Sequence, residues 1–117
     1  MALVLCTGVN PALVRTRQLL LEQAGHTVVP ALDEATLVVA CQNNQFDVAV
    51  IGQTISPRSK RRVLQVVRQH CPSSKVLELY ASTTGRILED ADSWLEVPAD
   101  VPEELVQRVE ALASDDA

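Results

Sequence analysis

The chain has 117 residues, a formal net charge of −5 and a hydrophobic fraction of 47%. This length suits one domain with a proper core, and the acidic balance argues against a dedicated nucleic-acid binder, which needs a concentrated basic surface. No stretch approaches the roughly 20 apolar residues that span a bilayer, and the N-terminus lacks the features of a signal peptide. We therefore expect one soluble, cytoplasmic domain over residues 1–117 with no membrane or nucleic-acid partner, whose last few residues fray.

Strand and helix patterns alternate from the N-terminus onward. Residues 2–6 form a short apolar run that predicts a strand. Asn10 and Pro11 follow as a helix cap and a preferred first helical residue. Apolar residues then recur at helical spacing as far as Gly25, where a helix stop is expected.

A second strand is predicted over residues 26–32, where Pro30 places it near the edge of the sheet because proline donates no ladder hydrogen bond. Asp33 caps the next helix. The stretch 46–54, FDVAVIGQT, is the organising element: its continuous apolar run predicts a central strand buried on both faces. It ends at Gly52, at the carboxyl edge where open α/β sheets keep their sites.

The third helix begins with another cap and proline at Ser56 and Pro57. Its apolar and basic side chains fall on opposite faces. Lys60 is the exception: it lies in the first turn and points the same way as the apolar side chains. We expect the Lys60 ammonium either to reach the carboxyl edge near Gly52 or, as long side chains often do, to extend to water.

The last third is predicted as a strand over residues 75–80, one or two helical turns within 81–91 and a strand over 93–97. A final helix follows a capping-box pair, Asp100 and Glu103. Five strands alternating with five helices, the fourth short, predict an α/β fold with a parallel sheet and helices on both faces.

Charge is distributed unevenly along the chain. A basic segment spans residues 58–75, and acidic residues crowd 89–116. Two interpretations stay open: oppositely charged faces that suit contacts with proteins, or ordinary solvated helix faces.

Three cysteines, Cys6, Cys41 and Cys71, are far apart and odd in number, so neither a disulfide framework nor a zinc site is indicated. They are expected to be buried thiols in a reducing compartment. His26 and His70 have no ligand partners at suitable spacing and are expected at the surface, so no metal is predicted. The sequence contains no phosphate-binding glycine motif and no recognisable set of catalytic residues. We therefore expect neither a cofactor nor enzymatic activity.

Cys6 carries one alternative. A cysteine at the end of a first strand, just before a helix N-terminus, is placed where thiolates become nucleophilic. The loop CTGVNP resembles those of low-molecular-weight tyrosine phosphatases and of the phosphocysteine IIB subunits of sugar phosphotransferase systems. It departs from the first at Ala12, where those phosphatases have an arginine, and from the second in having few Gly, Ser and Thr residues.

Several strings together resemble the receiver domains of bacterial response regulators. They are LLLEQAGHTVVPALDEATLVV at residues 19–39, FDVAVIG at 46–52 and SWLEVP at 93–98. The resemblance covers nearly the whole chain and implies a flavodoxin-like, doubly wound fold.

The resemblance also implies where the family's phosphorylation site would lie. The phosphoacceptor aspartate corresponds to Gly52, and the two magnesium-binding acids correspond to Cys6 and Thr7. Tyr80 stands at the Ser or Thr that ends strand four, and Val97 at the lysine of strand five. Since phosphoryl transfer needs the carboxylate, a metal held by hard oxygen ligands and a cation, a pseudo-receiver that binds no magnesium is implied.

Trp94 matches the strand-five aromatic that typically moves inward when receivers are activated. It is either an interaction or switch residue held in one state, or a packing residue. The segment between Ala81 and Pro98 is shorter than in the family, which affects the usual contact surface at helix four.

Three functions follow from the sequence. The first is a phosphorylation-independent interaction module of two-component-type signalling or phosphorelay, which docks to a protein partner or to itself as a homodimer. The second is a phosphocysteine carrier or phosphatase-like enzyme that uses Cys6. The third is a small-ligand sensor that uses the emptied pocket beside Gly52, with Lys60 attracting an anion.

Overall fold

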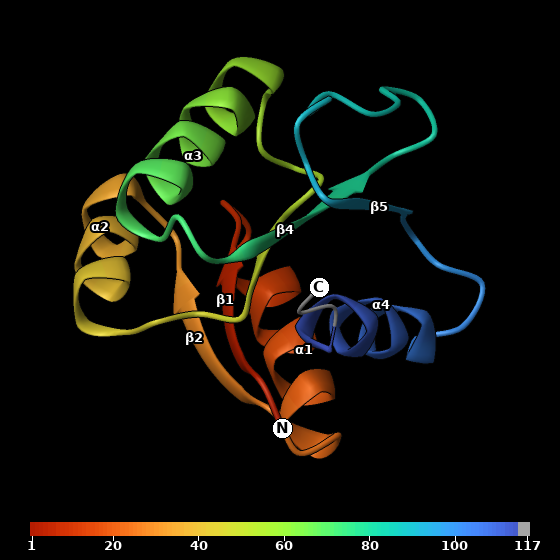
Figure 1. Ribbon diagram of the computed structural model, residues 1–117. Helices are drawn as coiled ribbons and strands as arrows, with labels where there is room; N and C mark the ends of the chain where they lie inside the picture. Colours follow the sequence, from red (N-terminus) through yellow and green to blue (C-terminus); the bar gives the residue numbers. More distant parts are fainter. Residues whose placement is uncertain (115–117) are drawn as a thin grey trace.

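Helices cover both faces of a parallel sheet in the computed structural model, which describes residues 1–114 (Figure 1). The strand order is β2-β1-β3-β4-β5, and each neighbouring pair is parallel. All five predicted strands are confirmed, and β2, which carries Pro30, is an edge strand as expected. Their bounds are β1 (Leu3–Thr7), β2 (Thr27–Ala31), β3 (Val48–Ile51), β4 (Lys75–Tyr80) and β5 (Ser93–Glu96).

Within residues 1–114 the chain forms four helices rather than five. They are α1 (Pro11–Gln23), α2 (Glu34–Asn43), α3 (Pro57–His70) and α4 (Glu103–Ala113). Helices α1 and α4 lie on one face of the sheet, and α2 and α3 lie on the other (Figure 1). We call these the α1/α4 face and the α2/α3 face.

Side chains cap three of these helices as predicted. Asn10 accepts hydrogen bonds from the first turn of α1, Asp33 does so for α2, and Ser56 for α3. Gly25 has φ 96° just after α1, a conformation that favours glycine. The predicted capping box of α4 is wrong: the helix begins after Pro102 with no side-chain cap, so Asp100 lies outside it.

The sheet separates two hydrophobic clusters. Strand β3 is buried along its whole length, with Ala49 and Ile51 facing the α2/α3 cluster and Val48 and Val50 facing the α1/α4 cluster. This confirms β3 as the central strand, because only a strand covered on both faces lacks polar positions.

The short helix expected within residues 81–91 is absent, and this segment forms turns instead. Hydroxyl side chains at 82–84 favour turns over helix, and Gly85 takes φ 70°. The backbone N–H groups of Ile87 and Leu88 donate to the Glu78 carboxylate on β4, so a side chain satisfies donors that would otherwise serve a helix.

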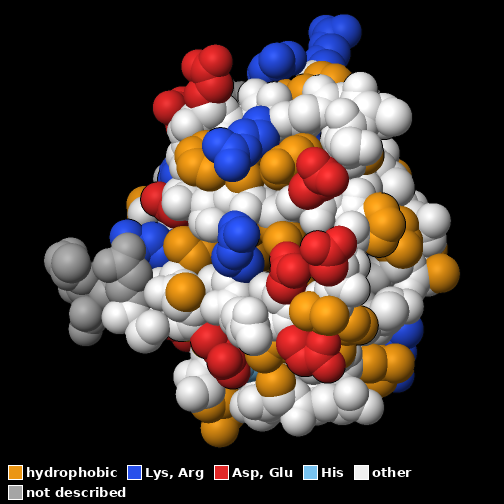
Figure 2. Space-filling view, turned by 90° about the vertical axis from the view of Figure 1, so that its right-hand side faces the viewer, with side chains coloured by type: hydrophobic (Ala, Val, Ile, Leu, Met, Phe, Trp, Pro, Cys, Tyr) orange, Lys and Arg blue, Asp and Glu red, His pale blue; other side chains and the backbone are white. Residues whose placement is uncertain are grey.

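Surface charge is mixed rather than divided on the side of the molecule that carries the 81–92 segment, β5 and α4. Figure 2 shows acidic, basic and hydrophobic side chains interspersed there. None of the helices within residues 1–114 combines the length and hydrophobicity of a membrane span. The expected fraying of the last residues concerns 115–117, which lie outside the described residues.

Candidate functional site

The candidate site lies at the carboxyl edge of the sheet, where β1 and β3 end side by side. Thr7 is paired with Ile51, and the Gly52 N–H donates to the Thr7 carbonyl oxygen at 3.2 Å. The Thr7 hydroxyl donates to the Val50 carbonyl oxygen at 2.9 Å. Two of the predicted site residues are therefore adjacent, but the Thr7 hydroxyl proton is committed to the sheet backbone.

Gly52 is enclosed by backbone and by an arginine. A Cβ atom at this position would lie 3.0 Å from the Thr7 carbonyl oxygen and 3.3 Å from Nη1 of Arg17. The Arg17 guanidinium comes from α1 and also donates through Nη2 to Oε1 of Gln53. A cation that was not predicted, Arg17, therefore lies beside Gly52.

Arg17 belongs to no motif that was predicted as a site, although helical periodicity indicates its burial. It lies three or four residues from Val14 and Leu21 on α1, both of which are buried, so helical periodicity places it within the apolar stripe. Its residue exposure is 9%. Burial lowers the pKa of the guanidinium, and the nearby Cys6 acts in the opposite direction.

Cys6 is fully buried among the side chains of the α1/α4 cluster. Burial raises the pKa of its thiol to about 11, although the Arg17 charge acts to lower it. Because the thiolate is the reactive form, this environment opposes nucleophilic chemistry at neutral pH. Cys41 and Cys71 are also buried and unpaired, as predicted for all three thiols.

The backbones of Tyr80 and Val97 are hydrogen-bonded to each other, but their side chains lie in different surroundings. The Val97 N–H donates to the Tyr80 carbonyl oxygen at 2.8 Å. The Tyr80 ring lies beneath the Arg86 guanidinium, 5.8 Å from ring centroid to Cζ, whereas Val97 packs against the α1/α4 cluster. The five predicted positions thus share one edge of the sheet without converging on one pocket. The Val97–Pro98 peptide bond is cis.

Trp94 is half-buried and held by several groups. Its Nε1 donates to the Leu88 carbonyl oxygen at 2.9 Å, and the Arg86 guanidinium stacks over its ring at 4.7 Å. Arg108 from α4 donates to the Trp94 carbonyl oxygen. The tryptophan therefore ties the 81–92 segment to β5.

The expectation that the Lys60 ammonium extends to water was wrong, whereas the ammonium does reach the carboxyl end of β4, next to the strand that ends before Gly52. The residue is 1% exposed, and its Nζ donates to Oε2 of Glu78 at 2.8 Å and to the Leu79 carbonyl oxygen at 2.9 Å. Glu78 is itself fully buried. Glu78 is a single acidic position within the predicted strand 75–80, and the local pattern does not reveal it as the partner that draws Lys60 inward.

His26 also differs from its prediction, because it is buried rather than at the surface. Its Nδ1 accepts from the Ala2 N–H at 3.0 Å, and its Nε2 lies 3.0 Å from Oε2 of Glu110. Among residues 1–114, no three His, Cys, Asp or Glu side chains gather in a group that could hold a metal ion.

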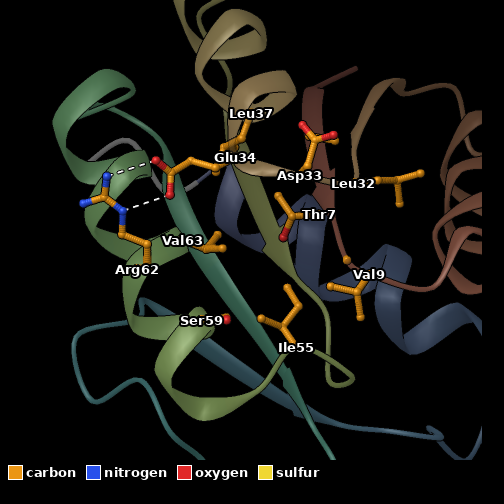
Figure 3. A pocket seen from close by; sticks show the side chains of 12 residues that line it. Thr7, Val9, Leu32, Asp33, Glu34, Leu37, Ile55, Ser59, Arg62 and Val63 are labelled. Carbon is orange, nitrogen blue, oxygen red and sulfur yellow. Dashed lines mark hydrogen bonds and ion pairs between the residues drawn. The ribbon is translucent and has the colours of Figure 1, made fainter.

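A small cavity opens beside Thr7 on the α2/α3 face (Figure 3). Its volume is about 220 Å³, and its walls are largely apolar, with Leu37, Ile55 and Val63 among them. Arg62 and Glu34 form a two-point ion pair at 2.9 and 3.0 Å, which lowers the pKa of Glu34. In Figure 3 this pair lies to one side of the Thr7 side chain.

The strand order, the parallel register and helices on both faces define a flavodoxin-like, doubly wound α/β protein. No protein-family model and no curated protein sequence matches the chain. Solved structures match it closely in fold, and those described next are receiver domains or response regulators.

Three comparisons illustrate the likeness. The receiver domain of the Francisella response regulator 1452 superposes with a TM-score of 0.75 at 23% identity, covering 97% of each chain. The Vibrio cholerae chemotaxis protein CheY4 gives 0.78 at 20% identity, covering 96% of this chain and 98% of that one. The receiver domain of the hybrid histidine kinase CckA gives 0.76 at 18% identity, covering 95% and 98%. The chain thus has the fold of response-regulator receiver domains, which confirms the predicted resemblance.

Proposed function

We propose that this chain is a pseudo-receiver, a phosphorylation-independent protein-interaction module in bacterial two-component signalling. The observation that carries the proposal is the occupancy of the phosphoacceptor position. Gly52 supplies no carboxylate, and the guanidinium of Arg17 lies against it. A receiver needs an acceptor carboxylate at this position, with a divalent cation held by oxygen ligands. In this protein the Arg17 guanidinium lies there instead.

The remaining positions support the same proposal. Cys6 and Thr7 stand at the metal-binding acids, and the Thr7 hydroxyl is engaged by the backbone. Tyr80 and Val97 stand at the Ser or Thr and the lysine, and their side chains point to different surroundings. We therefore propose that the module binds no magnesium and no other cofactor, and that it is not an enzyme.

Intact-mass analysis after incubation with acetyl phosphate and magnesium tests this proposal. We expect no phosphoryl adduct on the protein, while a phosphorylatable receiver treated in parallel acquires one. A stoichiometric adduct on this protein would overturn the proposal.

A Gly52→Asp variant makes the test sharper. Its Cβ would be crowded by the Thr7 carbonyl, and its carboxylate would meet the Arg17 guanidinium instead of a metal ion. We expect this variant to stay unphosphorylated too. Phosphoryl uptake by Gly52→Asp would show that the site retains its chemistry and lacks only the acceptor.

We propose that docking uses the cluster of Tyr80, Arg86, Trp94 and Arg108. Arg86 lies over both aromatic rings, and Arg86 and Arg108 are exposed. Trp, Tyr and Arg dominate the energetic centres of protein interfaces. The partner is a protein or a second copy of the chain, acting in the cytoplasm, where the three unpaired cysteines stay reduced.

Two charge-reversal variants test the docking surface. Arg86→Glu should remove partner capture or self-association, which light scattering and affinity capture with mass spectrometry detect. Arg15→Glu is the matched control, because Arg15 is an exposed residue of α1, which covers the sheet face opposite to the one against which Trp94 packs. Equal effects of the two variants would contradict this choice of surface.

The two other functions from the sequence find less support. An enzyme using Cys6 would need an accessible thiolate, and the thiol is fully buried with its pKa at about 11. A sensor that attracts its anion with Lys60 is disfavoured, since the Lys60 ammonium is paired with the buried Glu78. The formal charge of −5 favours neither nucleic acid nor an anionic membrane as a partner.

A further inference from the structure

Arg17 is a buried cation without a carboxylate partner within residues 1–114. The ion pairs found there involve His26, Lys60, Arg62 and Arg68. The hydrogen bond that Arg17 makes is to the neutral amide of Gln53. Burying a charge without an opposite charge is costly, so a cation in this state is a candidate for pairing with something outside the chain.

The unused donors of Arg17 are not sealed inside the protein. No enclosed side-chain nitrogen or oxygen within residues 1–114 lacks a hydrogen-bond partner. Since Nη2 alone is bonded, the other guanidinium nitrogens must reach accessible space. Arg17 and Gln53 both line a cavity of about 280 Å³ between α1, the end of β5 and the start of α4.

The rest of this cavity is apolar apart from Thr16, whose hydroxyl already donates to the Ala12 carbonyl oxygen at 2.9 Å. No Asp or Glu lines the cavity to repel an anion. The apolar walls come from α1, from the β4 and β5 strand ends with the following loop, and from α4, and include Leu13, Leu20, Leu79, Val97, Ala99 and Leu105.

We propose that this cavity binds a small organic acid, with its carboxylate on Arg17 and Gln53 and its apolar body against the leucines of α1 and α4. A planar guanidinium matches a carboxylate in two-point geometry. The Gln53 amide nitrogen has no partner within residues 1–114 and can supply a further donor. The burial that lowers the pKa of Arg17 is offset when an anion binds beside it.

The cavity volume limits the size of the acid. Binding pockets for drug-sized ligands occupy about 300–1,000 Å³, so a cavity of about 280 Å³ fits a compact acid with a short chain or a single ring. This inference does not depend on the proposed docking role, because the cavity and the Tyr80–Trp94 cluster use different side chains.

Titration with hexanoate, followed by two-dimensional ¹H–¹⁵N NMR, tests the proposal. We expect saturable shifts at the Gln53 side-chain amide, in α1 and near Leu105, with a dissociation constant of about 0.1–1 mM. Hexanol lacks the charge and acetate lacks the chain, so each should bind at least about tenfold more weakly. Binding of hexanol or acetate as strong as that of hexanoate would overturn the proposal, as would an absence of saturable shifts with hexanoate.

Matched variants locate the site. Arg17→Met should weaken hexanoate binding by at least about tenfold, whereas Arg15→Met, on the exposed side of the same helix, should leave it unchanged. Ala99→Phe keeps Arg17 and fills the cavity, so it should also abolish binding and guards against a folding defect in Arg17→Met. Unchanged binding in Arg17→Met or in Ala99→Phe would overturn the proposal.

Discussion

Within residues 1–114, each face of the sheet buries one lysine or arginine side chain, and the two are satisfied in different ways. On the α2/α3 face, Lys60 meets the Glu78 carboxylate at 2.8 Å, and that carboxylate also binds the backbone of the 81–92 segment. On the α1/α4 face, Arg17 meets the neutral amide of Gln53 and opens onto a cavity. The first arrangement is complete within the fold and explains how a segment without a helix stays in place. The second leaves a charge for an external group.

The comparison predicts that breaking the Lys60–Glu78 pair has the largest effect on stability. Glu78→Gln keeps the size of the side chain but leaves Lys60 buried without its counter-charge, which should cost about 3–5 kcal/mol. Urea unfolding measures this loss. Hydrogen exchange should also show that the Ile87 and Leu88 amides lose protection, because they donate to the same carboxylate.

Two controls separate this effect from loss of any ion pair. Glu34→Gln breaks an exposed pair with Arg62 and should cost far less. Adding Lys60→Met to Glu78→Gln removes the stranded charge and should recover part of the stability. If the double variant were less stable than Glu78→Gln alone, the uncompensated charge would not be the cause.

The sequence predicted the strands more completely than the charged interior. A strand such as β3 can be predicted from its apolar run. Caps such as Asn10 and Ser56 can be predicted because they bind N–H groups only two or three residues further along the chain. The Lys60–Glu78 pair joins residues 18 apart in the chain through a tertiary contact. Local patterns cannot show that two charged residues, each unfavourable when buried, become acceptable together.

The missing helix and the candidate site have related explanations. The helix predicted within 81–91 was wrong, because the Glu78 carboxylate that binds N–H groups of this segment was not visible from local sequence. The structure places Gly52 next to Thr7. Arg17 could have been found from its position in the apolar stripe of α1, while its approach to Gly52 required the packing of α1 on the sheet.

The second largest effect concerns pH and the α1/α4 face. The Cys6 thiol has its pKa raised from 9.0 to about 11 by burial, so the unfolded chain loses this proton at lower pH than the folded one. Stability contributed by Cys6 is therefore complete below pH 9 and falls as pH rises toward 11. The loss should reach about 2 kcal/mol by about pH 10.5.

Comparing the wild type with Cys6→Ala isolates this contribution. Urea unfolding of both proteins between about pH 8 and pH 10.5, with reductant present, should show a steeper decline for the wild type. The raised pKa of Cys41 is common to both proteins and cancels in the difference. Parallel declines would mean that Cys6 does not titrate differently on folding.

A third, smaller effect should follow from the contact that closes the 81–92 segment. Trp94→Phe removes the 2.9 Å hydrogen bond to the Leu88 carbonyl oxygen while keeping an aromatic ring, and should cost about 1 kcal/mol. Thermal unfolding measures this cost. If Trp94 instead moved between two states, the variant would be nearly neutral and the wild-type indole would give two sets of NMR signals.

Removing the cation of the α1/α4 face should change stability least. Arg17→Met loses one hydrogen bond to Gln53 but also removes a buried charge that has no carboxylate partner within residues 1–114, and its apolar side chain suits the surrounding cluster. These contributions oppose each other, so the free energy of unfolding should change by less than about 1 kcal/mol. Lys60→Met, which leaves the buried Glu78 carboxylate without its cation, should be far more destabilising in the same urea measurement. A loss in Arg17→Met as large as that in Lys60→Met would mean that Arg17 is satisfied within the fold, and the two faces would then bury their cations for the same reason.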